Sequence, residues 1–145
     1  MTIRFFESPQ TGIVIVSMSA GDYLLEGISE VARSANIHSG VLMTGIGSLS
    51  FARIHAVVTN HPPYQDLYYD LEGPVEIVGF RGIIASFEPH IHISLMDKNG
   101  RMIGGHLEDG CSILTLSEIS ILRLPDLNLA RRALPGDTIR LLDME

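Results

Sequence analysis

Three of the six histidines lie within residues 88–108, and their spacing suits metal coordination. His90 and His92 alternate with apolar residues in a stretch that predicts a β-strand. Side chains two apart on a strand share a face, and their Cα atoms are roughly 6.6–6.8 Å apart. Because zinc–nitrogen bonds are about 2.0–2.1 Å long, two imidazoles at this spacing can converge on one ion. The pair therefore indicates a divalent metal, and zinc, iron, copper and nickel all accept imidazole ligands.

The third candidate ligand is His106, and its position depends on the turn at residues 98–100. A two-residue turn would place His106 on the opposite face of the hairpin from His92. A three-residue loop, with Gly100 in the left-handed conformation, would place His106 directly opposite His92. The three-histidine site therefore requires the three-residue loop or a compensating bulge at Gly104-Gly105. These two glycines would also let another group approach the backbone beside the site.

Histidines on strands also have a structural interpretation, because a single one is most often a hydrogen-bonded residue with no ligand. A His-x-His pair alone is weak support for a metal site, and a register-matched third histidine strengthens it. Three histidines without a fourth protein ligand would leave an open coordination position, which suits water or a small substrate. An ion held in this way could polarise a carbonyl or lower the pKa of bound water to about 7.

Three charged residues, Glu118, Glu76 and Arg81, are candidates for acid–base roles or for supporting the metal ligands. Glu118 has the same strand parity as the apolar Leu116. A carboxylate on an apolar face must be paired, protonated or part of an active site. The simpler interpretation is an exposed edge position or an ion pair with an arginine such as Arg81 or Arg123.

Composition narrows the class of protein. The chain has 145 residues, 46% of them hydrophobic and 19% charged, which is enough for one domain with its own core. Its single cysteine, Cys111, cannot form an intrachain disulfide and favours a reducing compartment. The N-terminus lacks the apolar region of a signal peptide, and no apolar run approaches the roughly 20 residues of a membrane span. We therefore predict a cytoplasmic protein with no membrane partner.

The charge balance argues against nucleic acid as a partner. Ten basic and 17 acidic residues give a net charge of −7, and only Arg131-Arg132 are adjacent basic residues. Nucleic-acid-binding proteins usually present a basic face, whereas DNA phosphates would meet net repulsion here. DNA binding is kept as the alternative function.

The elements that must position these residues are mostly strands. A helix is predicted over residues 23–35, with Asp22 as its N-cap and apolar residues at helical spacing. Apolar or alternating runs predict strands at 4–6, 13–18, 41–48, 51–59, 75–86, 111–116 and 118–124, besides the histidine strand. The run 13–18 is apolar enough to predict burial on both faces of its strand. We expect His55 to be exposed or hydrogen-bonded. Residues 64–71 are predicted to be extended, and residues 72–74 to form a turn.

The predicted fold class is α/β of the α+β type, a single domain over residues 1–145 with one helix packed on a mostly antiparallel sheet. The core covers about 12–124. Residues 125–145 form a tail of unclear role, irregular or briefly helical, with a possible strand at 138–142.

Four stretches together resemble the plants-and-prokaryotes conserved domain (PPC) family, and they occur in the family's order. With the predicted helix they cover roughly residues 12–124. The stretches are TGIGSLS at 44–50, LEGPVEIVGFRG at 71–82, HIHISLMD at 90–97 and GGHL at 104–107.

The resemblance implies an α/β domain that assembles as a homotrimer. In prokaryotic members the matching histidines, here His90, His92 and His106, bind a divalent metal. Plant members carry an Arg-Gly-Arg-Pro AT-hook that binds DNA, and this chain has no such segment. The fold is also similar to that of acetolactate decarboxylase, which holds zinc with three histidines.

Three hypotheses follow. The first is a trimeric metalloprotein, with zinc preferred and a small molecule as a possible ligand of the open position. The second is a DNA-binding or chromatin-associated module. The third is an oligomerisation domain whose histidines hold no metal.

Overall fold

The computed structural model of the protein describes residues 3–135 and 139–145. Within them the chain forms one helix and nine strands. In chain order these are β1 (Arg4–Ser8), β2 (Ile13–Ser19), α1 (Leu24–Ser34), β3 (Ser39–Val57), β4 (Asp66–Ala85), β5 (Glu88–Asp97), β6 (Met102–Leu107), β7 (Ser112–Arg123), β8 (Leu129–Ala133) and β9 (Arg140–Met144).

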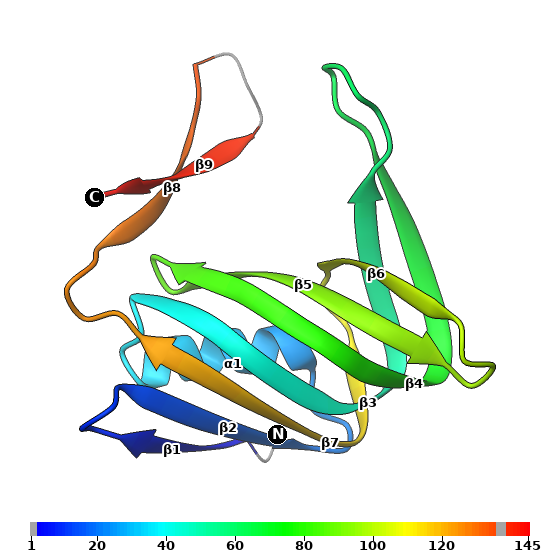
Figure 1. Ribbon diagram of the computed structural model, residues 1–145, viewed down its shortest axis with the longest axis horizontal. Helices are drawn as coiled ribbons and strands as arrows, with labels where there is room; N and C mark the ends of the chain where they lie inside the picture. The colour runs from blue at the N-terminus through cyan, green and yellow to red at the C-terminus, as the bar shows by residue number, and fades with distance from the viewer. Residues whose placement is uncertain (1–2, 136–138) are drawn as a thin grey trace.

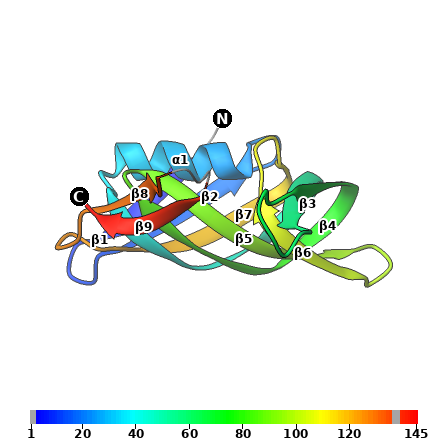
Figure 2. The same cartoon turned by 90° about the horizontal axis from the view of Figure 1, so that it is seen from above.

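Seven strands form one antiparallel sheet in the order β1-β2-β7-β3-β4-β5-β6, and β8 and β9 pair with each other (Figure 1). Figure 2 shows α1 lying along one face of the large sheet. β6 also pairs with β3, so β3, β4, β5 and β6 close on one another at one end. The predicted fold class, a mostly antiparallel sheet with one helix on it, is confirmed.

The core lies between α1 and the sheet, and β2 shows how the strands build it. Val14, Val16 and Met18 are buried, whereas Ile15 between them is 42% exposed. The prediction that this strand is buried on both faces is therefore wrong. Only one face of an antiparallel sheet needs to be covered, and here α1 covers only that face. We call the opposite face of the sheet the outer face.

The helix differs from its prediction at the first turn. It begins at Leu24, and Tyr23 occupies the N-cap position without a side-chain cap hydrogen bond. Asp22, the predicted cap, instead accepts a hydrogen bond of 3.0 Å from the backbone N–H of Ser19. The apolar stripe is as predicted, and the buried helix residues are Leu24, Gly27, Ile28, Val31 and Ala32.

Two interruptions expected from the sequence are absent, because β3 and β4 are continuous strands of 19 and 20 residues. The predicted turn at 72–74 lies inside β4, opposite a bulge in β3 between Leu49 and Phe51. A Cβ at Gly73 would lie 2.5 Å from the carbonyl oxygen of Leu49. Gly73 therefore serves a close approach of two backbones, and its turn-like sequence was misleading. β7 similarly unites the two strands predicted at 111–116 and 118–124.

The tail is a β-hairpin, which corrects the prediction of an irregular or briefly helical segment. β8 pairs with β9, whose start at Arg140 overlaps the predicted strand 138–142, and Thr138 lies outside the described residues. The hairpin is tied to the sheet, because the N–H of Leu129 donates to Ser39 Oγ at 2.9 Å. Leu129 in turn accepts a backbone hydrogen bond from Ser86, also at 2.9 Å.

In Figure 1 the β8–β9 hairpin and the outer end of the β3–β4 hairpin project from the same side of the large sheet. Among the described residues, no helix has both the length and the apolar character needed to cross a membrane.

Candidate metal centre

The β5–β6 hairpin has the three-residue loop that the histidine site requires. The N–H of Asp97 donates to the carbonyl oxygen of Arg101 at 2.9 Å, and Gly100 has a φ of 76°. His92 consequently lies directly opposite His106 in the β5–β6 ladder. Both features of the predicted register are confirmed.

Three imidazoles therefore gather on the outer face. The ring centroids of His90 and His106 are 4.6 Å apart, and that of His92 lies 5.5 Å from His90 and 5.6 Å from His106. One ring nitrogen of each lies within 4.8 Å of the others. Tetrahedral zinc with bonds of about 2.0–2.1 Å places its ligand atoms roughly 3.4 Å apart. Small rotations of partly exposed side chains close that difference, so the three residues fit a metal.

A fourth histidine, His55, joins the cluster from β3. It pairs with His106 across the β3–β6 contact, and the two rings stack with centroids 4.5 Å apart. Its Nδ1 lies 2.5 Å from Oε1 of Glu108, which is also 3.9 Å from Nε2 of His106. His55, His106 and Glu108 thus form a second group whose ligand atoms lie within 4.8 Å of one another.

Sequence reasoning missed His55 and Glu108 as site residues. They are 53 residues apart in the chain, and no local pattern signals that β6 reaches β3. The available local signal was Glu108, an acidic residue directly after the strand that contains Gly104, Gly105 and His106. A carboxylate that holds one nitrogen of a histidine fixes the tautomer and orientation of its ring.

The glycines before His106 allow a close approach to their backbone, as predicted. A Cβ at Gly105 would lie 2.5 Å from the carbonyl oxygen of His55, and one at Gly104 would lie 2.9 Å from that of Ile93. The group that approaches them is therefore the backbone of β3 and β5. Their small size lets β6 fit between these two strands.

Two histidines of the cluster, His106 and His90, favour the neutral imidazole. Burial, followed by the charges that His90, His55 and His92 would carry, lowers the pKa of His106 to about 4, with Asp66 acting in the opposite direction. The pKa of His90 is also lowered, first by burial and then by the charge of Arg131. Metals bind the neutral form of imidazole, so these side chains are ready to coordinate at neutral pH without losing a proton.

The lowered pKa of His106 predicts that the metal-free protein loses stability as the pH falls from about 6.5 to 4. In this window the unfolded chain binds a proton at His106 and the folded chain does not, so the free energy of unfolding decreases with falling pH. Since the His106 side chain is 26% exposed, screening reduces the effect to on the order of 1–2 kcal/mol. Urea unfolding at pH 7 and 4.5 should show a smaller pH difference for His106→Gln, and an equal difference would contradict the assignment.

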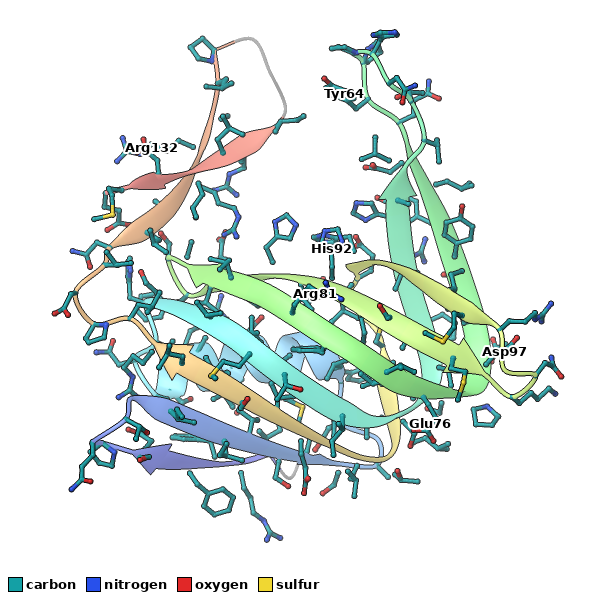
Figure 3. All side chains as sticks on the ribbon, viewed as in Figure 1. Tyr64, Glu76, Arg81, His92, Asp97 and Arg132 are labelled. Atoms are coloured by element: carbon teal, nitrogen blue, oxygen red, sulfur yellow. The ribbon has the colours of Figure 1, made fainter. Side chains whose placement is uncertain are left out.

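Of the three other candidates, only Arg81 lies at the histidines. It pairs with His92 across the β4–β5 ladder, and both line an open cleft of about 600 Å³ together with His55 and Ser94. Figure 3 shows Arg81 beside His92, with Glu76 far along the sheet.

Glu76 and Glu118 are held away from the cluster by the sheet. Glu76 pairs with Met96, and Glu118 pairs with Ile46 in β3. β7 is three strand spacings from the histidine strand, which is about 14 Å. Glu118 is exposed on the outer face, but β7 lies between β2 and β3, so Glu118 is not at the exposed edge that its simpler interpretation expected.

The chain is similar to several solved structures. A protein from Ralstonia eutropha JMP134 whose name proposes DNA binding is 25% identical, with a TM-score of 0.77 over 97% of this chain and 96% of its own. A metal-containing protein from Archaeoglobus fulgidus is 23% identical, with a TM-score of 0.76 over 97% of each chain.

A more distant structure extends the comparison of folds. It is a protein of unknown function from Staphylococcus aureus, described as similar to α-acetolactate decarboxylase. It is 14% identical, with a TM-score of 0.52 over 77% of this chain and 52% of its own. The predicted similarity to the acetolactate decarboxylase-like fold is therefore confirmed at the level of architecture.

Among curated proteins, the bifunctional protein GlmU of a Synechococcus strain is 28% identical over 116 residues. The match covers 80% of this chain and 17% of that protein, so this chain spans about a sixth of the relative's length. The sequence profile of the Plants and Prokaryotes Conserved (PCC) domain matches residues 6–125. With this match over most of its length, the chain belongs to the Plants and Prokaryotes Conserved domain family.

Proposed function

We propose that this protein binds one divalent metal ion through His90, His92 and His106, with an open coordination position for water or a small molecule. The observation that carries the proposal is the placement of one ring nitrogen from each histidine within 4.8 Å of the others. Zinc is the preferred ion, and iron, copper and nickel also suit three imidazoles. A bound ion would supply a Lewis acid that polarises a carbonyl or lowers the pKa of bound water.

Two further observations support a binding role. The cleft of about 600 Å³ at His92 is of a size that accepts a small molecule. The metal-containing protein of Archaeoglobus fulgidus has the same fold. His55 and Glu108 would support the three metal ligands, since the His55 ring stacks on His106 and Glu108 holds Nδ1 of His55.

A homotrimer is part of the proposal, and the outer face supports assembly. Ile15, Ile46 and Leu116 project from three neighbouring strands and are 42%, 55% and 44% exposed. An apolar surface of this kind on a sheet is typical of an interface between subunits. We further propose a cytoplasmic location, for which the single, buried Cys111 is the support.

The test is a zinc titration of the purified, untagged protein with elemental analysis and thermal unfolding. We expect about one zinc per chain, and a stabilisation of about 2.7 kcal/mol when free zinc is 100 times its dissociation constant. Magnesium should give no comparable stabilisation, because it prefers oxygen ligands. If the protein contained no zinc after dialysis against a zinc-containing buffer, and its unfolding temperature did not change, the proposal would be refuted. The histidines would then have a purely structural role.

DNA binding is the second candidate function, favoured by the name of the 25% identical Ralstonia relative. Against it stands the net charge of −7. The hypothesis predicts a mobility shift of duplex DNA that weakens steeply between about 50 and 200 mM salt. No shift at the lower salt concentration would eliminate it.

A further inference from the structure

Two arginines lie beside the histidine cluster without a carboxylate in ion-pair contact among the described residues. Arg81 lies opposite His92 in the β4–β5 ladder, and Arg131 lies in β8. Among the described residues neither guanidinium lies within 4.0 Å of a carboxylate, although several other arginines are paired in this way. Two unpaired cations near a metal site indicate a place prepared for negative charge.

Arg131 is held in place and left incompletely bonded. Its Nη2 donates to the carbonyl oxygen of Ile83 at 3.4 Å, whereas its Nη1 is buried and has no hydrogen-bond partner among the described residues. Burial and the neighbouring Arg140 lower its pKa, and Glu88 partly offsets them. A buried cationic nitrogen without an acceptor costs free energy, which an arriving anion would recover.

Two carboxylates of this region, one on β5 and one on β9, are already paired with other arginines. Glu88 lies 3.6 Å from Arg140, and Asp143 lies 3.8 Å from Arg132. Among the described residues of this hairpin, Arg131 is thus the arginine that has no carboxylate within 4.0 Å, and its hydrogen bond to Ile83 directs it toward the large sheet.

A pocket of about 290 Å³ joins the two arginines to the metal ligands. Arg81, His90, His92 and Arg131 all line it, with Gly82 and Ile83 beneath. Two guanidinium groups and two metal-ligating imidazoles therefore border one space, and its volume suits a small molecule.

We propose that Arg81 and Arg131 form an anion-binding site and that the ligand of the metal's open position is a small carboxylic acid, bound as its carboxylate. This inference rests on the proposed metal site. A planar carboxylate matches the two parallel N–H groups of a guanidinium better than it matches a point charge. Arg131 lies outside the stretch 6–125 that defines the family match, so this feature depends on the C-terminal hairpin.

The experiment is calorimetric titration of the zinc-loaded, full-length protein with lactate and with its neutral amide, lactamide. Lactate should bind at least about tenfold more tightly, because hydrogen bonds between charged groups are the stronger class. Arg131→Gln and Arg81→Gln should each weaken lactate binding by about tenfold or more and leave lactamide unchanged. Zinc content and circular dichroism of each variant check that the site is still folded.

Arg132→Gln is the matched control, because it removes one positive charge from the adjacent position of the same strand. Arg132 pairs with Asp143 and lies on the side of the hairpin away from His92 in Figure 3. Its substitution should change lactate binding less than twofold. Arg131→Lys keeps the positive charge but lacks the two parallel N–H groups of the guanidinium, so it should bind lactate more weakly than the wild type and more tightly than Arg131→Gln. This variant keeps the test decisive if Arg131→Gln folds poorly.

The outcomes separate the two proposals. If zinc binds and lactate does not, or if lactate and lactamide bind alike, the anion site is refuted and the metal site stands. Inorganic phosphate binding more tightly than lactate, with the same dependence on Arg131, would refute the carboxylate assignment. Failure of zinc itself to bind would refute both.

Discussion

Replacing His106 with alanine is expected to abolish tight zinc binding. His106 belongs to both groups of metal-ligating side chains, one with His90 and His92 and the other with His55 and Glu108. Protein zinc sites bind with about 10–16 kcal/mol, so one of three ligands contributes roughly 4 kcal/mol, on the order of a 10³-fold change in affinity. Competition with a chromophoric chelator at pH 7 measures the affinity of the wild type and the variant.

The companion variants decide which group holds the ion. With the metal on the three-histidine group, His92→Ala should lose as much affinity as His106→Ala, and Glu108→Gln only about 10–100-fold. The reverse order would place the ion between His55 and Glu108. His61→Ala, in an exposed loop, is the control and should bind zinc as the wild type does. Wild-type zinc affinity in both His92→Ala and His106→Ala would exclude the whole histidine cluster as the zinc site.

The three-histidine group could be predicted from the sequence because its geometry is local. His-x-His fixes a shared strand face, and one loop of three residues fixes the register of His106 against His92. Both depend on residues fewer than 20 apart, where turn chemistry and strand period are reliable guides.

His55 and Arg131 could not be predicted because their positions depend on contacts between distant segments. His55 reaches the cluster only because β6 pairs with β3. Arg131 reaches it only because β8 and β9, which have no strong strand pattern in the sequence, pair with each other beside the sheet. In the same way Glu118 had the right parity for an apolar face, but that face is the exposed one, and β7 is three strand spacings from the strand that carries His90 and His92.

The dependence on tertiary contacts gives a second large expected effect, at Gly105. A Cβ at this position would lie 2.5 Å from the carbonyl oxygen and 3.2 Å from the carbonyl carbon of His55. Backbone atoms cannot rotate away as a side chain does, so β6 would have to move off β3. Leu107, fully buried and paired with Ile54, would move with it. We expect Gly105→Ala to destabilise the metal-free protein by about 3 kcal/mol.

Thermal unfolding at one fixed protein concentration measures this as a decrease in Tm of about 10 °C. Gly79→Ala is the matched control, because its Cβ would meet side chains and no backbone, Ser94 at 3.4 Å and the Arg81 guanidinium at 3.8 Å. Its cost should stay within about 1 kcal/mol. Zinc affinity should fall in Gly105→Ala as well, since the same displacement moves His106 away from His92. If Gly105→Ala matched the wild type in both stability and zinc affinity, β6 would not lie against β3. The stacking of His55 on His106 would then be wrong, while the β5–β6 register that aligns His92 with His106 would still allow the three-histidine site.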